Sequence, residues 1–270
     1  MKYYLNILKF NIFYEQPIKI IFRAINLIFL LILKRQKIFF FKFSNYKIYF
    51  NFIPMKKHMG GRGIFLFREN LEPLLKFGYK LLKKNTYVID AGANQGVFAV
   101  SFAKYIGPGG RVLAFEPFKK YENIIKNNQR LNNLQNIIFF PFALSNIKKR
   151  AIIDYSHGIG SASITKKFGD KKKYIHTTVL DQILDKRIKN LSLIKLDIEG
   201  AEALALIGAQ KTLKKYKPTI VVECFCKEFF QINKVLSRIG YRSYKFSKNG
   251  NLIKIYRPNK FEANVIFLPS

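Results

Sequence analysis

Acidic residues are scarce in this sequence. Its 270 residues include 16 Asp and Glu against 48 Lys and Arg, which gives a formal net charge of +32. A charge balance this basic points to an anionic partner: nucleic acid, an anionic membrane surface, or an acidic substrate such as a phosphorylated glycan. An AT-rich coding sequence would also supply much of the lysine, because Ile, Phe, Asn and Tyr are abundant beside it. That bias does not explain the shortage of acids.

Cysteine is nearly missing as well. The two cysteines, Cys224 and Cys226, are separated by one residue, which excludes a disulfide framework. Without a second pair they also make no zinc site. We therefore expect a protein of a reducing compartment, the cytoplasm. Hydrophobic residues make up 49% of the chain, which is enough for a large core and too much for global disorder.

The sequence has no long hydrophobic run. The most apolar stretch, residues 24–33, would span about 15 Å as a helix, half of a bilayer core of about 30 Å. Extending it back to Ile18 includes Lys19 and Arg23, and no small-residue cleavage site follows. We therefore expect neither a transmembrane helix nor a secretory signal. Two alternatives remain: a helix that packs on the rest of the protein, or a helix that lies on the inner membrane surface with its lysines at the head groups.

A glycine-rich segment, G-G-R-G at residues 60–63, predicts a loop or hinge that divides the chain. Residues 1–60 would form a basic, aromatic-rich extension with a helix, and residues 61–270 the main domain. In that domain short apolar runs alternate with helical patterns, which predicts an α/β fold with a doubly wound, mostly parallel, Rossmann-like sheet. Such sheets bind ligands at the carboxyl ends of their strands. The predicted strands are 87–90, 111–116, 137–140, 193–197, 219–223, 241–246 and 263–267; the predicted helices are 70–84, 96–105, 121–132, 201–216 and 229–239; an irregular insertion with short β-like pieces covers 147–178.

The most informative segment is D-A-G-A-N-Q-G at residues 90–96, where a predicted strand ends in an acid and a glycine-rich turn leads into a helix. Gly92 and Gly96 permit a tight turn and a close approach of the backbone to a ligand. The start of the helix offers free N–H groups. A dinucleotide site would show G-x-G-x-x-G here. The turn is instead G-x-x-x-G preceded by Asp90, and a carboxylate suits a cationic ligand better than a pyrophosphate.

A second acid supports a ligand site at this edge. Glu116 ends the next predicted strand, R-V-L-A-F-E at residues 111–116. An acid roughly 20 residues beyond the glycine turn holds the ribose diol in Rossmann-type sites. Taken alone, Asp90 could be the N-cap of the next helix and Glu116 a solvated strand end. Together, at the tips of consecutive strands, they favour a ligand that carries a ribose.

With these residues the sequence resembles the FkbM-type methyltransferases, a branch of the class I S-adenosylmethionine-dependent enzymes. The resemblance covers about residues 86–223, roughly half of the chain. It rests on these motifs: D-A-G-A-N-Q-G at 90–96, A-F-E-P at 114–117, N-N-Q-R-L-N at 127–132, A-L-S at 143–145, T-x-L-D at 178–181 and, as the most specific, I-K-L-D-I-E-G-A-E at 194–202.

The resemblance implies a sheet of about seven strands with a reversed terminal hairpin, and S-adenosyl-L-methionine as cofactor. It also implies roles for individual residues of the site. Asp90, Gly92 and Gly96 would surround the methionine portion of the cofactor, and Asn94 would line the same turn. Glu116 would hold the ribose. Ala143, just beyond the third strand of the sheet, would border the adenine.

The reacting group is expected where strand 193–197 ends. A hydroxyl that attacks a methyl group has to be aligned and has to lose a proton, which a nearby carboxylate can accept. Asp197 and Glu199 are therefore our catalytic candidates, with Asp197 as the base or as the group that orients the hydroxyl. Together with Glu202 they could instead complement a helix N-terminus or bind a divalent ion, although we expect no metal. His157, in the irregular insertion, is an alternative base or a sugar contact.

The resemblance implies an O-methyltransferase that acts on a hydroxyl of a glycan or other secondary metabolite. No N-P-P-Y-like motif follows strand 193–197, where methylases of nucleic-acid amino groups carry one, so a base nitrogen is not expected as the acceptor. Two alternatives stay open. The charge favours an RNA-modifying methyltransferase, and a basic, membrane-associated scaffold without activity would also fit the composition. Asp90, Gly92, Gly96 and Glu116 are all present, which speaks against loss of the cofactor site.

Overall fold

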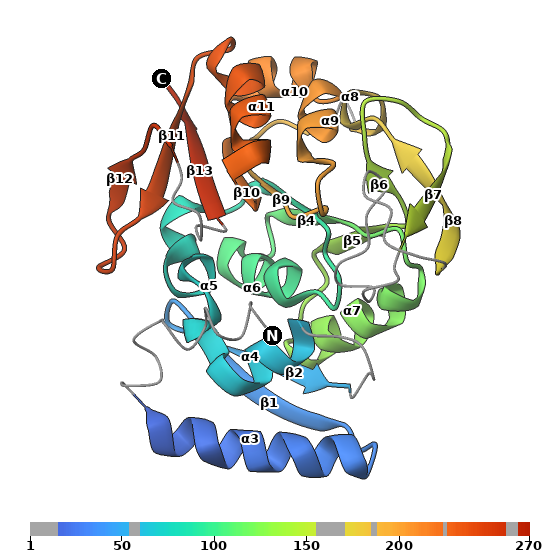
Figure 1. Ribbon diagram of the computed structural model, residues 1–270, viewed down its shortest axis with the longest axis vertical. Helices are drawn as coiled ribbons and strands as arrows, with labels where there is room; N and C mark the ends of the chain where they lie inside the picture. Colours follow the sequence, from blue (N-terminus) through green and yellow to red (C-terminus); the bar gives the residue numbers. More distant parts are fainter. Residues whose placement is uncertain (1–15, 54–59, 155–170, 185–187, 224–225, 258–263) are drawn as a thin grey trace.

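A mixed sheet of eight strands forms the centre of the protein (Figure 1). The computed structural model describes residues 16–53, 60–154, 171–184, 188–223, 226–257 and 264–270. The strand order is β5-β4-β3-β9-β10-β13-β11-β12. These strands are β3 Tyr87–Ala91, β4 Arg111–Phe115, β5 Ile137–Phe140, β9 Leu191–Leu196, β10 Thr219–Glu223, β11 Tyr241–Phe246, β12 Leu252–Lys254 and β13 Asn264–Pro269.

Five neighbouring strands, β5, β4, β3, β9 and β10, are parallel, and β13 runs antiparallel between β10 and β11. This confirms the expected doubly wound sheet with a reversed terminal hairpin. The prediction missed β12 at the sheet edge. All three residues of β12 are exposed, so it lacks the buried apolar pattern by which the other strands were recognised.

Helices cover both faces of the sheet (Figure 1). On one face lie α6 Val97–Ile106 and α7 Lys120–Leu131, and on the other α9 Glu202–Ile207, α10 Gln210–Tyr216 and α11 Cys226–Ser237. Neighbouring residues of one strand belong to different cores. Val88 packs in the cluster that contains Phe102 of α6, and Ile89 in the cluster that contains Phe229 of α11. Burial on both faces explains why these strands are continuous apolar runs.

Two predicted helices are interrupted. The single helix predicted over 70–84 is wrong: that part of the chain consists of η1 Arg68–Leu71, α5 Pro73–Phe77 and η2 Gly78–Leu81. Pro73 begins a new helix and cannot continue the preceding one. The helix predicted over 201–216 breaks between α9 and α10. A Cβ at Gly208 would lie 2.3 Å from the carbonyl oxygen of Ser145, so the backbone approaches the insertion closely there.

The loop predicted for residues 60–63 is also wrong, because they begin helix α4 Gly60–Phe67. The glycines serve close packing rather than a turn. A Cβ at Gly61 would lie 3.1 Å from the side chain of Gln95, and one at Gly63 would lie 2.9 Å from Leu71.

The N-terminal part contains helix α3 Pro17–Ile32, as expected, followed by a hairpin that the sequence analysis did not predict. Its strands are β1 Lys37–Phe43 and β2 Tyr46–Phe52. The hairpin turns alternate residues into the main core, where they pack with Phe102 of α6. Those residues are Phe39, Phe41, Phe43, Ile48, Phe50 and Phe52. The segment therefore shares its core with the sheet domain.

The irregular insertion and the residues just before it form a small sheet of β6 Ala143–Leu144, β7 Arg150–Asp154 and β8 Lys172–Thr178. A short helix, α8 Leu180–Ile183, follows. His157 lies outside the described residues. Within the described parts of the chain, no helix has both the length and the apolarity needed to cross a membrane.

Candidate active site

The turn between β3 and α6 brings the backbone of two strands into close contact. Gly92 has a φ of 80°, and a Cβ at this position would lie 1.8 Å from the carbonyl oxygen of Asp197, at the end of β9. Gly92 N–H donates to the carbonyl of Phe115 at 2.9 Å, so the turn is also fixed to the end of β4. Only glycine fits both the left-handed conformation and this contact. Gly96 has a φ of 86° and caps α6.

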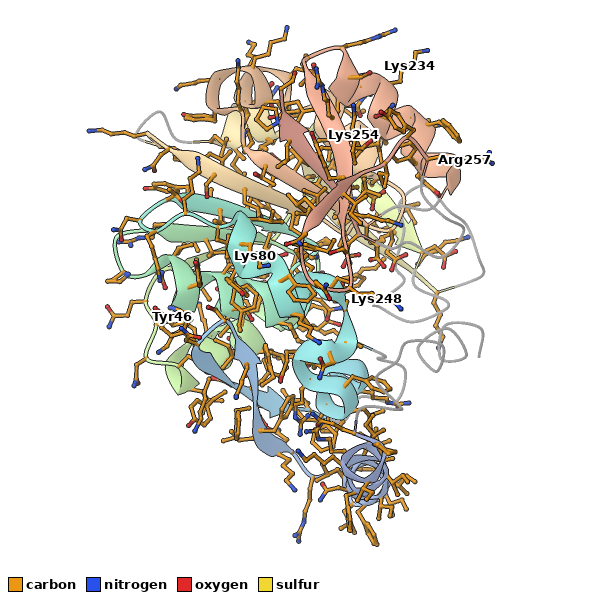
Figure 2. The ribbon with its side chains drawn as sticks, turned by 90° about the vertical axis from the view of Figure 1, so that its left-hand side faces the viewer. Tyr46, Lys80, Lys234, Lys248, Lys254 and Arg257 are labelled. Carbon is orange, nitrogen blue, oxygen red and sulfur yellow. The ribbon has the colours of Figure 1, made fainter. Side chains whose placement is uncertain are left out.

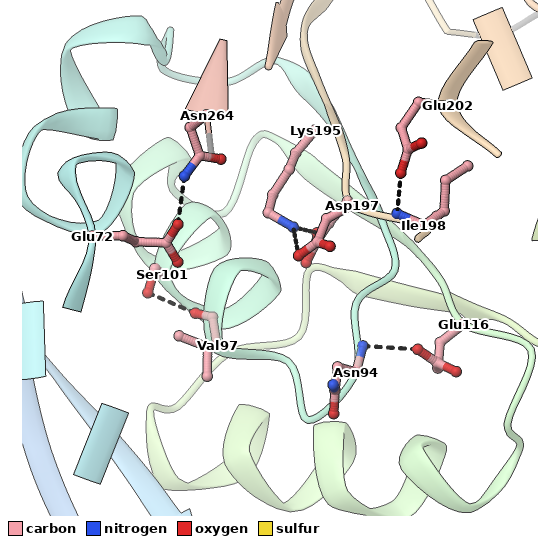
Figure 3. Close-up of polar contacts among 11 residues, drawn as sticks. Glu72, Asn94, Val97, Ser101, Glu116, Lys195, Asp197, Ile198, Glu202 and Asn264 are labelled. Atoms are coloured by element: carbon pink, nitrogen blue, oxygen red, sulfur yellow. Dashed lines mark hydrogen bonds and ion pairs between the residues drawn. The ribbon is translucent and has the colours of Figure 1, made fainter. Parts of the chain in front are cut away.

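Glu116 is buried beside this turn. Its Oε2 accepts the backbone N–H of Asn94 at 3.0 Å (Figure 3). Its Oε1 accepts the N–H of Phe118 at 3.0 Å. Burial raises the pKa of Glu116 to about 7, against the lowering effect of these two N–H donors. Each carboxylate oxygen has two lone pairs, so the fixed side chain can still accept hydrogen bonds from a ligand.

A buried lysine joins the tips of β3 and β9. Lys195 is 2% exposed, and its Nζ lies 3.1 Å from Asp197 Oδ2 and 3.7 Å from Asp90 Oδ1 (Figure 3). Burial alone would lower the pKa of Lys195, but Asp197 and Asp90 outweigh it and the pKa is raised. The lysine is therefore a permanent cation between two carboxylates. Its Nζ also lies 4.6 Å from the ring centroid of Phe98.

The two carboxylates beside Lys195 differ in their environment. Asp90 is 0% exposed and, among the described residues, neither of its oxygens accepts a hydrogen bond. Burial raises the pKa of Asp90 to about 6. The side chain of Asp197 is 32% exposed. Although partial burial opposes it, the Lys195 ammonium lowers the pKa of Asp197. At neutral pH both are ionised, but Asp197 is the one that a ligand can reach.

Two further acids face the same cluster. Glu72, next to α5, accepts a hydrogen bond from Asn264 Nδ2 at 2.6 Å, and burial raises the pKa of Glu72 to about 7. Glu223 ends β10 and interacts with Asp197. Burial, together with the negative charge of Asp197, raises the pKa of Glu223 well above its usual value. Both causes favour the neutral form of Glu223 beside Asp197.

Glu199 and Glu202 occupy the turn that follows β9. Glu199 has a φ of 56° and is half-buried. Glu202 is buried, and its carboxylate accepts the N–H of Ile198 at 2.9 Å and the N–H of Gly200 at 2.9 Å. Glu202 therefore closes the turn before α9, the structural alternative that the sequence left open for it. Ala143 is buried in β6, beside Phe118 and Tyr121.

The sequence analysis gave no role to Lys195 or Glu72. A signal for Lys195 was present, because a lysine inside an apolar parallel strand must have anionic partners. Glu72 is 18 residues before Asp90 in the chain and Glu223 is 26 residues after Asp197. Nothing in their local sequence shows that they meet at the same site.

The site concentrates negative charge in a basic protein. Among the described residues no group of three or more His, Cys, Asp or Glu is arranged to hold a metal ion. Seven acids instead influence one another electrostatically, and four of them, Glu72, Asp90, Asp197 and Glu223, also act on Lys195. The seven, out of 16 acids in the chain, are Glu72, Asp90, Glu116, Asp197, Glu199, Glu202 and Glu223. Such an edge favours a cationic ligand.

The sequence model of the methyltransferase FkbM domain matches residues 90–243, more than half of the chain. The chain belongs to the FkbM methyltransferase family. It is an S-adenosylmethionine-dependent methyltransferase, and the resemblance seen in the sequence is confirmed.

Individual relatives are distant. Methyltransferase sdnD of Sordaria araneosa is 24% identical over 175 residues, which are 53% of this chain and 67% of that protein. The crystal structure of methyltransferase FkbM from Methylobacillus flagellatus is 18% identical with a TM-score of 0.47, and the match covers 77% of this chain. This chain spans about half, 53%, of that protein. A SAM-dependent O-methyltransferase from Thermotoga maritima is 14% identical with a TM-score of 0.41, over 85% of this chain and 76% of that one.

The described residues fit this cofactor. S-adenosylmethionine carries a sulfonium and an ammonium group, and the acids around Lys195 offer the complementary charge. Glu116 is held by two backbone N–H groups at the tip of β4, where a ribose diol is held in Rossmann-type sites. Asp90 has no exposed surface. It can therefore act on a ligand through its charge and through the turn that it begins.

Proposed function

We propose that this methyltransferase acts on a hydroxyl oxygen of a glycan or another secondary metabolite. The observation that carries the proposal is Asp197. Of the two carboxylates paired with Lys195, it is the partly exposed one, and its pKa is lowered. An ionised, accessible carboxylate can accept a hydrogen bond from a hydroxyl and take its proton.

The cofactor-binding roles are part of the same proposal. Glu116 holds the ribose, and the turn with Gly92, Asn94 and Gly96 lines the methionine portion. Asp90 begins that turn and contributes negative charge to the site from its buried position. Ala143 borders the adenine. For all of these residues except Ala143, support comes from their position along one edge of the sheet, where the ends of β3, β4 and β9 meet.

S-adenosylmethionine held by Glu116 and the turn with Gly92, Asn94 and Gly96 would supply an electrophilic methyl group to the acceptor oxygen. The protein has to align the hydroxyl with that methyl group and receive its proton. Asp197 orients the hydroxyl and takes the proton. Lys195 fixes the Asp197 carboxylate, which keeps it ionised until the reaction. Glu199, two residues further along the turn, contacts another polar group of the acceptor.

One observation supports a second candidate, an RNA substrate: the formal net charge of +32. A chain this basic binds polyanions without regard to sequence. The charge alone does not select RNA over an acidic glycan, since both are polyanions.

Methyl transfer from labelled S-adenosylmethionine distinguishes these acceptors. We expect label in alkali-stable methyl ethers when the protein is given a mixture of hydroxyl-bearing glycans and metabolites, and much less with the Glu116→Ala variant at a cofactor concentration that does not saturate it. Preferential labelling of total RNA would show that RNA, and not a glycan, is the acceptor. Label that enters only amines would contradict the hydroxyl as acceptor.

A further inference from the structure

The helix α3 presents an apolar face to solvent. It forms the outer edge of the molecule below β1 (Figure 1), and in Figure 2 it is seen end-on with side chains projecting away from the protein. The exposed apolar side chains recur at helical spacing and are between 48% and 70% exposed: Ile18, Ile21, Phe22, Ile25, Ile28, Phe29, Ile32 and the following Leu33. A contiguous apolar patch of this kind marks a surface that contacts another apolar phase.

Two polar residues of α3, Arg23 and Asn26, contact the rest of the protein. Arg23 Nη1 donates to the carbonyl of Leu66 at 2.9 Å, and Asn26 Oδ1 accepts from Lys37 Nζ at 3.2 Å. Ile20 and Leu27 are buried on the same side. These contacts fix the rotation of the helix about its axis. The outward direction of the apolar face therefore follows from polar anchoring. The inner side of the helix packs on the protein, and its outer side remains exposed.

The charges around this face identify the partner. Residues 16–53 contain seven basic residues and no acid. Those at the ends of α3 are exposed: Lys19 near the start, and Lys34, Arg35 and Lys37 just beyond the end. Two copies of the chain that met through α3 would bring these like charges together, which disfavours a dimer. An anionic surface with an apolar interior complements both features.

We propose that α3 is a docking helix for anionic lipid bilayers and lies in the plane of the membrane surface. Its 16 residues would span about 24 Å, which is too short to cross a hydrocarbon core of about 30 Å. Its isoleucine and phenylalanine side chains enter the acyl region, and the basic residues at its ends contact lipid phosphates. The rest of the domain then stands on the membrane with Arg23 and Asn26 still bound to the protein.

Vesicle sedimentation with the full chain tests this surface. The Phe22→Gln/Phe29→Gln variant changes only side chains that are 70% and 59% exposed. The matched control, Phe230→Gln/Tyr256→Gln, changes aromatic residues that are 55% and 80% exposed elsewhere. On vesicles of phosphatidylglycerol and phosphatidylcholine, the α3 variant should lose about two orders of magnitude in partition coefficient, and the control should bind like the wild type. Binding of the wild type should weaken in high salt and on pure phosphatidylcholine.

A fluorescence measurement gives a second, independent readout. The chain has no tryptophan, so Phe29→Trp introduces a single reporter in α3, and Phe230→Trp one in α11. Anionic vesicles should shift the emission of the first to shorter wavelength and leave the second unchanged. The proposal is overturned if the α3 variant binds vesicles as tightly as the wild type, because net charge alone would then explain binding. It is also overturned if the wild type ignores vesicles and forms dimers that the α3 variant abolishes.

Discussion

Asp197→Asn is expected to lower kcat by about 10²–10⁴-fold, the usual contribution of a positioned base, while affinity for S-adenosylmethionine changes little. The substitution keeps the shape of the side chain and removes its charge and basicity. Asp197 is the more exposed partner of Lys195 at the tip of β9. The variant therefore lacks the group that takes the proton of the substrate hydroxyl, whereas Glu116 still binds the cofactor. Single-turnover rates and calorimetric titration of the cofactor measure the two effects separately.

Glu223→Gln is the matched comparison for that variant. Burial and the charge of Asp197 raise the pKa of Glu223 well above its usual value, which favours its neutral form. An amide resembles that form, so the loss of kcat should be far smaller than for Asp197→Asn. Near-normal turnover of Asp197→Asn would mean that alignment alone suffices or that another group is the base. Loss of cofactor binding would move Asp197 to the cofactor side of the site. If a chelator abolished activity and Mg²⁺ restored it, Asp197 would be a metal ligand.

Lys195→Met should lower the free energy of unfolding by about 3–5 kcal/mol, the cost of removing one partner from a buried ion pair. The substitution leaves Asp90, which is 0% exposed, without its cation. Urea denaturation at pH 8 measures the loss. Lys126→Met, at an exposed i,i+4 pair with Glu122, is the control and should change stability little.

The pH dependence of the Lys195→Met effect identifies its cause. The pKa of Asp90 is about 6 with Lys195 present, and without the ammonium it rises further. At pH 5 Asp90 is then protonated in the variant, and a neutral carboxyl is cheaper to bury than a charged one. The destabilisation should therefore be largest near pH 8 and shrink toward pH 5. An equal loss at both pH values would indicate a packing defect in place of an unpaired charge.

The sequence identified the ligand-facing edge of the sheet because that edge is encoded locally. Asp90, Gly92 and Glu116 follow apolar strands directly, and glycines at a strand-to-helix turn have few other uses. The anionic partners of Lys195 could not all be predicted, since they come from segments far apart in the chain. Glu72 precedes the sheet and Glu223 ends its fifth parallel strand, and only the strand order brings them together.

The N-terminal hairpin was missed for a different physical reason. In K-I-F-F-F-K-F, phenylalanine occurs at both buried and exposed positions of β1, so the alternation that marks a half-buried strand is hidden. The glycines at residues 60–63 led to the opposite error, because a helix was predicted as a loop. Glycine permits both turns and close helix packing, and the sequence does not state which of these uses applies.

Calorimetric titration of S-adenosylmethionine into the wild type and Glu116→Ala at pH 8 tests the account most directly. At pH 8 Glu116 is mostly ionised, because its pKa is about 7. We expect the wild type to bind one cofactor and the variant to lose about 1.5–3 kcal/mol of binding free energy, the range for hydrogen bonds to a charged group. Equal affinity of the two proteins would contradict the account, because the ribose would then lie away from the tip of β4.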